Sequence, residues 1–200
     1  MLKYRPFEMH CHTRHSDGTF LVPQLIESVA AYGYAGLALT DHNAVTGLLE
    51  VTEELQRKNN CLVLPGIEWT TFYGHLLVIG CDRFVDWRFV TPDTIDEALQ
   101  EIRAAGGIAG VAHPCEVGSP LMCGCNWEFR VKRWDLMDYV EIWSGPDPHA
   151  SAKNGLAMPW YDALLNQGYH LAISAGRDWH GPDKPGQIPL LTATYLGIDG

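Results

Sequence analysis

Histidine and carboxylate side chains that could bind a metal ion recur along this 200-residue chain. The strongest local signal is the pair His10 and His12, because side chains two residues apart in an extended segment point to the same face and can reach one cation. Asp17 follows in an Asp-Gly pair, which is a common turn by itself. Either feature alone is weak, so the case for a metal site depends on whether further ligands join them.

Most of the remaining candidate ligands lie next to runs of sequence with the composition of β-strands. We expect strands at residues 7–11, 36–40, 61–65, 76–80, 108–112, 139–143, 171–175 and 191–196. The polar residues at or near the ends of these strands are Asp41, His42, Glu68, His75, His113, Asp178 and His180. Asp41 and Asp178 have a simpler reading as helix N-caps. Six of the nine histidines nevertheless fall at expected strand ends, which favours one shared site.

Helical periodicity alternates with these strands. The apolar spacing predicts helices at residues 23–31, 45–58 and 156–166, and a further one from Thr91 or Asp93 to Ala104 or Ala105. Alternating strands and helices imply a parallel sheet, either open or closed into a barrel. A β/α barrel gathers its site from many strand ends, whereas an open sheet concentrates ligands at one crevice. The distribution of the polar residues therefore favours a barrel, in one domain over residues 1–200.

Composition excludes several classes of protein. The formal net charge of −10 argues against a surface for nucleic-acid polymers, which needs clustered Lys and Arg. No apolar run approaches the roughly 18 residues of a membrane span, and the first residues lack the apolar stretch of a signal peptide. We therefore expect a soluble, cytoplasmic protein that does not depend on disulfides, in which Cys61 and Cys81 are buried free thiols.

The order and spacing of the candidate ligands resemble the PHP (polymerase and histidinol phosphatase) superfamily of metal-dependent hydrolases. The four motifs of that family correspond here to His10-x-His12 with Asp17, Asp41-His42, Glu68 with His113, and Asp178-x-His180. The resemblance implies an α/β fold, a distorted seven-stranded β/α (TIM-like) barrel. Shorter strings at Gly74-His75, Asp86-Trp87-Arg88, residues 141–145 and Asp178-Trp179-His180 are similar to the CehA/McbA branch, named after a carbamate-insecticide hydrolase.

The resemblance also implies two or three divalent cations, and mixed imidazole and carboxylate ligands suit Mn²⁺, Zn²⁺ or Fe²⁺. The first cation would be held by His10, His12, Glu68 and Asp178. Glu68 would bridge to a second cation, completed by His75 and His113. The third cation, or the other ion of a binuclear site, would be held by Asp17, His42 and His180. Some family members use a histidine near His15 where this chain has Asp17. Asp41 is expected to orient the ligating histidines without binding a cation itself.

Such a cluster implies hydrolysis without a protein nucleophile, since cations lower the pKa of a bound water from about 15.7 toward 7. The expected catalytic residues are Glu68, His75, Asp178 and His180. Arg177 and Arg14 stand beside ligands in the sequence and could grip a phosphate through the guanidinium fork. Arg177 departs from the small polar residue usual in the superfamily, and its alternative reading is an arginine at the surface or paired with a carboxylate.

Three functions follow as hypotheses. The first is a phosphoesterase that hydrolyses a small phosphomonoester or nucleotide, so that the partner is a small phosphorylated molecule. The second is a carbamate or carboxylic ester hydrolase that uses the same cluster. The third is a non-catalytic metal-binding or partner-binding module, against which the full ligand set argues.

The C-terminal end of the chain bears on closure of the barrel. The sequence stops at Gly200, soon after the last expected strand, whereas family members carry further closing elements. We therefore expect a barrel that is incomplete at its C-terminus, and a homo-oligomer or other partner subunit could cover the gap.

Overall fold

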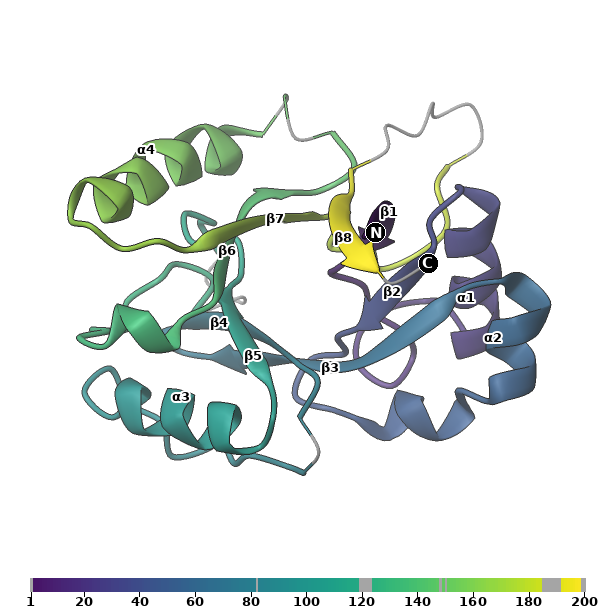
Figure 1. Cartoon of the computed structure of the whole chain (residues 1–200), viewed down its shortest axis with the longest axis horizontal. Coiled ribbons are helices and arrows are strands. Elements are labelled where there is room, and N and C mark those ends of the chain that lie inside the picture. Colours follow the sequence, from purple (N-terminus) through teal and green to yellow (C-terminus); the bar gives the residue numbers. More distant parts are fainter. Residues whose placement is uncertain are drawn as a thin grey trace.

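The computed structural model describes residues 2–81, 83–118, 124–147, 149, 151–184 and 192–198. The strands in this part of the chain form one eight-stranded sheet in the order β7-β6-β5-β4-β3-β2-β1-β8 (Figure 1). Neighbouring strands are parallel except where β4 meets β3 and β5 and where β8 meets β1. The strands are β1 (Lys3–Glu8), β2 (Gly36–Leu39), β3 (Leu62–Thr71), β4 (Gly74–Ile79), β5 (Ile108–Val111), β6 (Tyr139–Ser144), β7 (Ala172–Gly176) and β8 (Thr194–Ile198).

The sheet curls into a nearly closed barrel, because its two outer strands approach each other. The Thr194 hydroxyl at the start of β8 accepts a hydrogen bond from the Ala175 N–H at 2.8 Å and donates one to the Ala175 carbonyl at 2.9 Å. The α/β barrel predicted from the sequence is therefore confirmed. Two details differ from the prediction. The described residues form eight strands rather than seven, and the two outer strands leave little of the opening that was expected at the C-terminal end of the barrel. The last strand was expected at residues 191–196 but begins at Thr194, and Leu191 lies outside the described residues.

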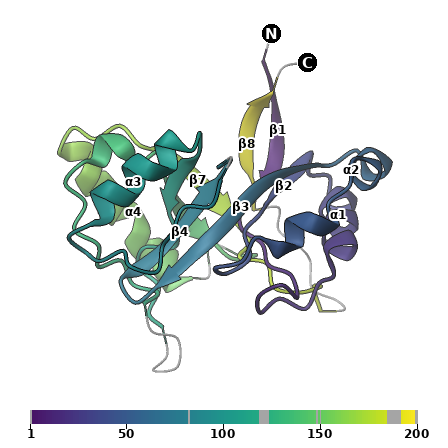
Figure 2. The ribbon, with the colours of Figure 1, turned by 90° about the horizontal axis from the view of Figure 1, so that it is seen from below.

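Helices flank the barrel on two sides. Both views place α1 and α2 beside β2 and β3, and α3 and α4 at the other end of the sheet (Figures 1 and 2). None of the described helices combines the length and apolar character needed to cross a membrane. The helices are α1 (Val22–Ala31), α2 (Glu53–Asn59), α3 (Ile95–Ala104) and α4 (Ala152–Asn166), with 3₁₀ turns η1 (Thr46–Glu50) and η2 (Trp134–Leu136).

The expected helix at residues 45–58 is wrong, because Thr52 divides it into η1 and α2. Thr52 adopts an extended backbone, and its side-chain oxygen accepts a hydrogen bond from the Leu55 N–H at 3.1 Å. Such a cap begins a new helix, since threonine oxygens satisfy the free N–H groups of a first turn. A similar local hydrogen bond precedes α3. The Thr91 N–H donates to the Thr94 hydroxyl at 2.9 Å, and the helix begins at Ile95 rather than at Thr91 or Asp93.

Apolar stripes on the helices form the core outside the barrel. The buried residues of α1 are spaced three and four apart, as are those of α3, so each set lies on one helix face. These residues are Val22, Leu25, Ile26 and Val29 in α1, and Ile95, Ala98, Leu99 and Ile102 in α3. Cys61, expected to be a buried free thiol, is buried and free in the structure, and Cys123 lies outside the described residues. Packing against the outer face of the sheet leaves the strand ends available for the polar residues.

Candidate metal centre

The segment that carries His10 and His12 is held beside the segment that carries Asp178 and His180. β1 ends at Glu8, earlier than expected, and beyond it Cys11 forms an isolated parallel bridge with Trp179. The His12 N–H donates to the Trp179 carbonyl at 2.9 Å, and the Trp179 N–H donates to the His10 carbonyl at 3.1 Å. This short parallel pairing brings the first and last motifs of the sequence together.

Glu68 and His75 lie diagonally across a hairpin, in which Glu68 pairs with Leu77 and His75 pairs with Thr70. β3 was expected to end before Glu68, but it continues to Thr71 because β4 pairs with it in antiparallel register. The antiparallel direction places the start of β4 at the edge where the parallel strands end. His75 therefore reaches the same region as residues that follow parallel strands, and its Nδ1 lies 2.9 Å from Glu68 Oε1.

The Glu68 carboxylate lies at the centre of the cluster and is fully buried. Its Oε1 atom faces two imidazoles, at 2.9 Å from His75 Nδ1 and 3.2 Å from His113 Nε2. Its Oε2 atom faces three others, at 3.1 Å from His10 Nε2, 3.4 Å from His12 Nε2 and 2.9 Å from His42 Nδ1. The two oxygens thus face different sets of nitrogen atoms, as a carboxylate that bridges two cations requires.

Electrostatics keep Glu68 ionised. Burial alone raises the pKa of Glu68, but the charge of His10 and hydrogen bonds from its imidazole neighbours lower it well below its usual value. Burial also opposes a charge on His10, yet Glu141, Glu68 and Asp178 together raise the pKa of His10 well above its usual value. Burial lowers the pKa of His12 to about 4. The ionised Glu68 and the neutral His12 are in the protonation states that bind a cation, whereas His10 would lose its proton on binding one.

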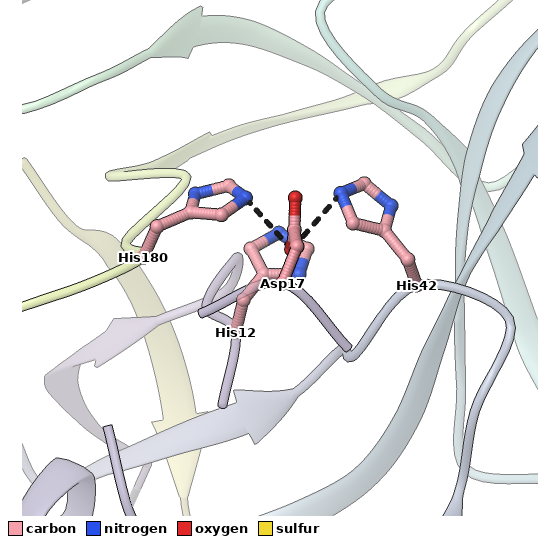
Figure 3. A group of neighbouring side chains, drawn as sticks. All are labelled: His12, Asp17, His42 and His180. Carbon is pink, nitrogen blue, oxygen red and sulfur yellow. Dashed lines mark ion pairs between the residues drawn. The ribbon is translucent and has the colours of Figure 1, made fainter. Parts of the chain in front are cut away.

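A second group opens to solvent and consists of His12, Asp17, His42 and His180 (Figure 3). The imidazoles of His180 and His42 point toward Asp17 from two sides, with distances to Asp17 Oδ1 of 3.2 Å from His180 Nε2 and 3.7 Å from His42 Nε2. The Asp17 side chain is 58% exposed, and that of His180 is 37% exposed. This group forms the accessible side of the cluster.

The residues fit a metal cluster. Their ligand atoms fall into five groups, within each of which the atoms lie no more than 4.8 Å apart. Two buried atoms at the centre, His10 Nε2 and Glu68 Oε2, lie 3.1 Å apart without the geometry of a hydrogen bond, and a buried polar atom that lacks a well-formed bond costs about 1–3 kcal/mol. A bound cation would satisfy both. The five groups contain every ligand expected from the sequence: His10, His12, Asp17, His42, Glu68, His75, His113, Asp178 and His180.

The structure favours Asp17 over His15 as a potential ligand. His15 lies against η1, with its Nε2 2.7 Å from Glu50 Oε1 and its Nδ1 2.9 Å from Thr46 Oγ1. Asp41 lies behind the loop that carries Asp17 rather than behind a histidine, which differs from the expected role. The Asp41 carboxylate accepts hydrogen bonds from Thr13 N at 2.6 Å, Thr13 Oγ1 at 2.7 Å and Ser16 Oγ at 2.7 Å.

Glu141 is the carboxylate that orients the histidines, and its chemistry was not recognised in the sequence. It lies within β6 and is buried, with its Oε1 3.0 Å from His10 Nδ1. Its Oε2 accepts a hydrogen bond from the His113 N–H at 3.1 Å. A side chain at Gly176 would collide with this pair, since an added Cβ would lie 2.5 Å from His10 Cβ and 2.8 Å from Glu141 Oε1. Carboxylates in this position fix the ring orientation of metal-binding histidines.

Glu116 is a second carboxylate near the cluster that was not recognised from the sequence. Its Oε2 lies 3.3 Å from His113 Nδ1, and it forms one of the possible metal-binding groups with His113 and Asp178. The one sequence signal was its position three residues after His113, where a turn returns the chain through a hydrogen bond from Glu116 N to the His113 carbonyl.

The two arginines expected to grip a phosphate lie in different surroundings. Arg177 is only 2% exposed, its Nη2 is 2.6 Å from Asp183 Oδ1, and its guanidinium lies 4.1 Å from the centre of the Trp179 ring. The pairing with Asp183 matches the alternative reading of Arg177, and its role in binding phosphate stays a prediction. Arg14 is exposed, and its Nε donates to the Thr19 carbonyl at 3.1 Å.

The chain belongs to the PHP domain family, whose description matches residues 8–111, just over half of the chain. In addition, 79 residues are 34% identical to the 3',5'-nucleoside bisphosphate phosphatase of Chromobacterium violaceum. That similarity covers 38% of this chain and 27% of the relative, so the chain spans about a quarter of the length of the curated protein it matches.

Solved structures share the fold at low sequence identity. A two-domain protein from Bacteroides vulgatus that contains a predicted PHP-like metal-dependent phosphoesterase superimposes with a TM-score of 0.66 at 18% identity, over 90% of this chain and 53% of that one. A putative metal-dependent phosphoesterase from Bifidobacterium adolescentis gives 0.63 at 17% identity, over 94% and 92%. An amidohydrolase from Chromobacterium violaceum, solved with bound sulfate and no metal, gives 0.59 at 18% identity, over 96% and 92%.

Replacing Glu141 tests whether it orients His10 for metal binding. Glu141→Gln keeps the shape but removes the charge that His10 Nδ1 faces, so we expect metal affinity to fall by about 10–100-fold. Competition with a chelator of known affinity measures this, and Glu101→Gln on the exposed surface of α3 is the matched control. Unchanged affinity in Glu141→Gln would show that the contact is only structural.

The choice between Asp17 and His15 is tested by a pair of substitutions. Asp17→Asn should lower the number of metal ions bound per chain, because an amide oxygen is a weaker ligand than a carboxylate. His15→Gln should leave that number unchanged, because His15 faces Glu50 and Thr46. Elemental analysis of both purified variants measures the outcome, and the reverse pattern would assign the ligand to His15.

Proposed function

We propose that the chain is a metal-dependent phosphoesterase that hydrolyses a small phosphomonoester or nucleotide. The observation that carries this proposal is the buried Glu68 carboxylate, whose two oxygens face two different sets of imidazoles. Membership of the PHP domain family supports it independently. A site with these parts suits hydrolysis, since no protein nucleophile is needed when cations activate water.

Two or three divalent cations, Mn²⁺, Zn²⁺ or Fe²⁺, would supply the acidity that converts a bound water to a nucleophile. His10, His12, Glu68 and Asp178 would hold one cation, His75 and His113 would complete a second that Glu68 shares, and Asp17, His42 and His180 would hold a further one. Among these residues, Glu68, His75, Asp178 and His180 are the proposed catalytic residues.

A backbone hydrogen bond determines which nitrogen of His180 carries the proton. The Nδ1 atom of His180 lies 2.9 Å from the Asp178 carbonyl, which can only accept a hydrogen bond, so Nδ1 carries the proton. In the neutral ring, Nε2 therefore presents a lone pair toward Asp17. The backbone of residue 178 thus selects the form of His180 that binds a cation.

The choice of a phosphate substrate depends on the curated relative rather than on Arg177. That relative is a nucleoside bisphosphate phosphatase by name, and the similarity to it covers part of each chain. Because Arg177 is buried and paired with Asp183, it gives less support for a dianionic substrate than its sequence position suggests. We therefore keep the second candidate, a carbamate or carboxylic ester hydrolase of the CehA/McbA type. The complete set of ligands argues against a non-catalytic module.

Parallel assays of the metal-loaded protein test the proposal. We expect hydrolysis of p-nitrophenyl phosphate or nucleoside monophosphates, loss of activity with a chelator, and recovery on addition of Mn²⁺. Glu68→Gln should abolish the activity, because it removes the charge that both cation sites share. Phosphodiesters and aryl carbamates are assayed beside them, and turnover of carbamates alone would establish the second candidate. A fully metal-loaded protein that cleaves none of these substrates would refute catalysis of either kind.

A further inference from the structure

Lys153 places a positive charge next to the candidate metal centre. It lies in the first turn of α4, and its Nζ is 2.8 Å from Glu116 Oε2. Glu116 in turn lies among the possible metal-binding groups, with His113 and Asp178. Among the described ion pairs between a lysine or arginine and a carboxylate, this one alone includes a carboxylate from such a group.

The start of α4 is fixed to the sheet, so Lys153 has a defined position. The neighbouring residue, Asn154, is buried and forms two hydrogen bonds to Ser144 at the end of β6. Its Oδ1 accepts from the Ser144 N–H at 3.0 Å, and its Nδ2 donates to the Ser144 carbonyl at 3.0 Å. These two hydrogen bonds join α4 to β6, the strand that also carries Glu141.

The cluster is more exposed on the side where Lys153 and Glu116 lie than at its centre. His10, His12 and Glu68 are completely buried. The side chains of Lys153 and Glu116 are 21% and 25% exposed, similar to the 20% of Asp178. Lys153 therefore lies nearer to solvent than the central carboxylate.

A positively charged side chain at this edge would offset the acidic protein groups that a dianionic substrate meets there. Asp178, Glu116 and Glu141 all lie close to His10 or His113. The Arg177 guanidinium is buried against Trp179 and paired with Asp183 through Nη2. Burial lowers the pKa of Lys153, but the hydrogen bond and charge of Glu116 outweigh that effect, so Lys153 stays protonated.

We propose that Lys153 binds the anionic oxygens of the substrate's phosphoryl group, and that Glu116 is the partner it exchanges for the substrate. The proposal rests on the phosphoesterase function proposed above, which it deepens by naming a residue that selects a phosphorylated substrate. An ammonium group on a flexible stem offers three donors, so it can leave one carboxylate oxygen and engage a phosphoryl group. Glu116, once released, still has His113 Nδ1 at 3.3 Å.

Binding of inorganic phosphate to the metal-loaded protein tests this directly by titration calorimetry. Lys153→Met should weaken phosphate binding by at least about tenfold, the usual loss for a hydrogen bond between charged groups. Lys153→Arg should retain much of the affinity. The matched control is Lys58→Met, which removes a lysine from an exposed ion pair with Glu27 and should change the affinity by less than about twofold.

Glu116→Gln distinguishes substrate binding from a structural role. If Glu116 competes with phosphate for Lys153, its neutral variant binds phosphate more tightly than the wild type. If the ion pair only stabilises the start of α4, Glu116→Gln binds phosphate less tightly or equally, which overturns the proposal. Metal content is measured in every variant, so that the comparison is made between equally loaded proteins.

Two further results would overturn the role of Lys153: no phosphate binding by the wild type, or equal binding by Lys153→Met at full metal content. A different result would refute the proposed phosphoesterase function. A wild type that binds phosphate through Lys153 but hydrolyses no phosphomonoester refutes the function and leaves the anion site. A wild type that hydrolyses phosphomonoesters while Lys153→Met binds phosphate normally refutes only the role of Lys153.

Discussion

The structure depends on how a buried carboxylate is stabilised. Glu68 is completely inaccessible to solvent, and an isolated charge in such a place costs several kcal/mol. Five imidazoles around it offset that cost, two at one oxygen and three at the other. They come from the segment after β1, the segment after β2, the start of β4 and the segment after β5. The barrel is the arrangement that delivers all of these segments to one place.

Several backbone features serve the same end. β4 runs antiparallel to its neighbours, so His75 enters from the start of a strand while the other ligands lie near strand ends. His113 and Asp178 both have positive φ angles, at 25° and 51°, which non-glycine residues rarely adopt. Such conformations persist where surrounding contacts hold them, and they concentrate at functional sites. For His113 that contact is the hydrogen bond from its N–H to Glu141.

The sequence predicted the potential ligands because their chemistry is visible in single residues. A histidine, aspartate or glutamate near an apolar run stands out, and nine such residues lie in the groups that the structure brings together. Glu141 and Lys153 could not be recognised in this way. Glu141 lies inside a strand, Lys153 lies inside a helix, and their roles depend on contacts with residues 131 and 37 positions away.

Other differences have equally local causes. Arg177 lies next to Asp178 in the sequence, but its side chain packs against Trp179 and pairs with Asp183. β3 extends past its expected end because pairing with β4 outweighs the break in its apolar pattern. The hydroxyl of Thr52 divides one expected helix into two. Periodicity indicates which elements exist, whereas long-range pairing and individual hydrogen bonds decide where they end.

The central claim is that Glu68 is shared by two cations. Anomalous diffraction from crystals grown with Mn²⁺, recorded above and below the manganese absorption edge, tests it most directly. The account predicts at least two anomalous peaks, one in contact with each carboxylate oxygen of Glu68. A single peak, or peaks that do not contact Glu68, would contradict it.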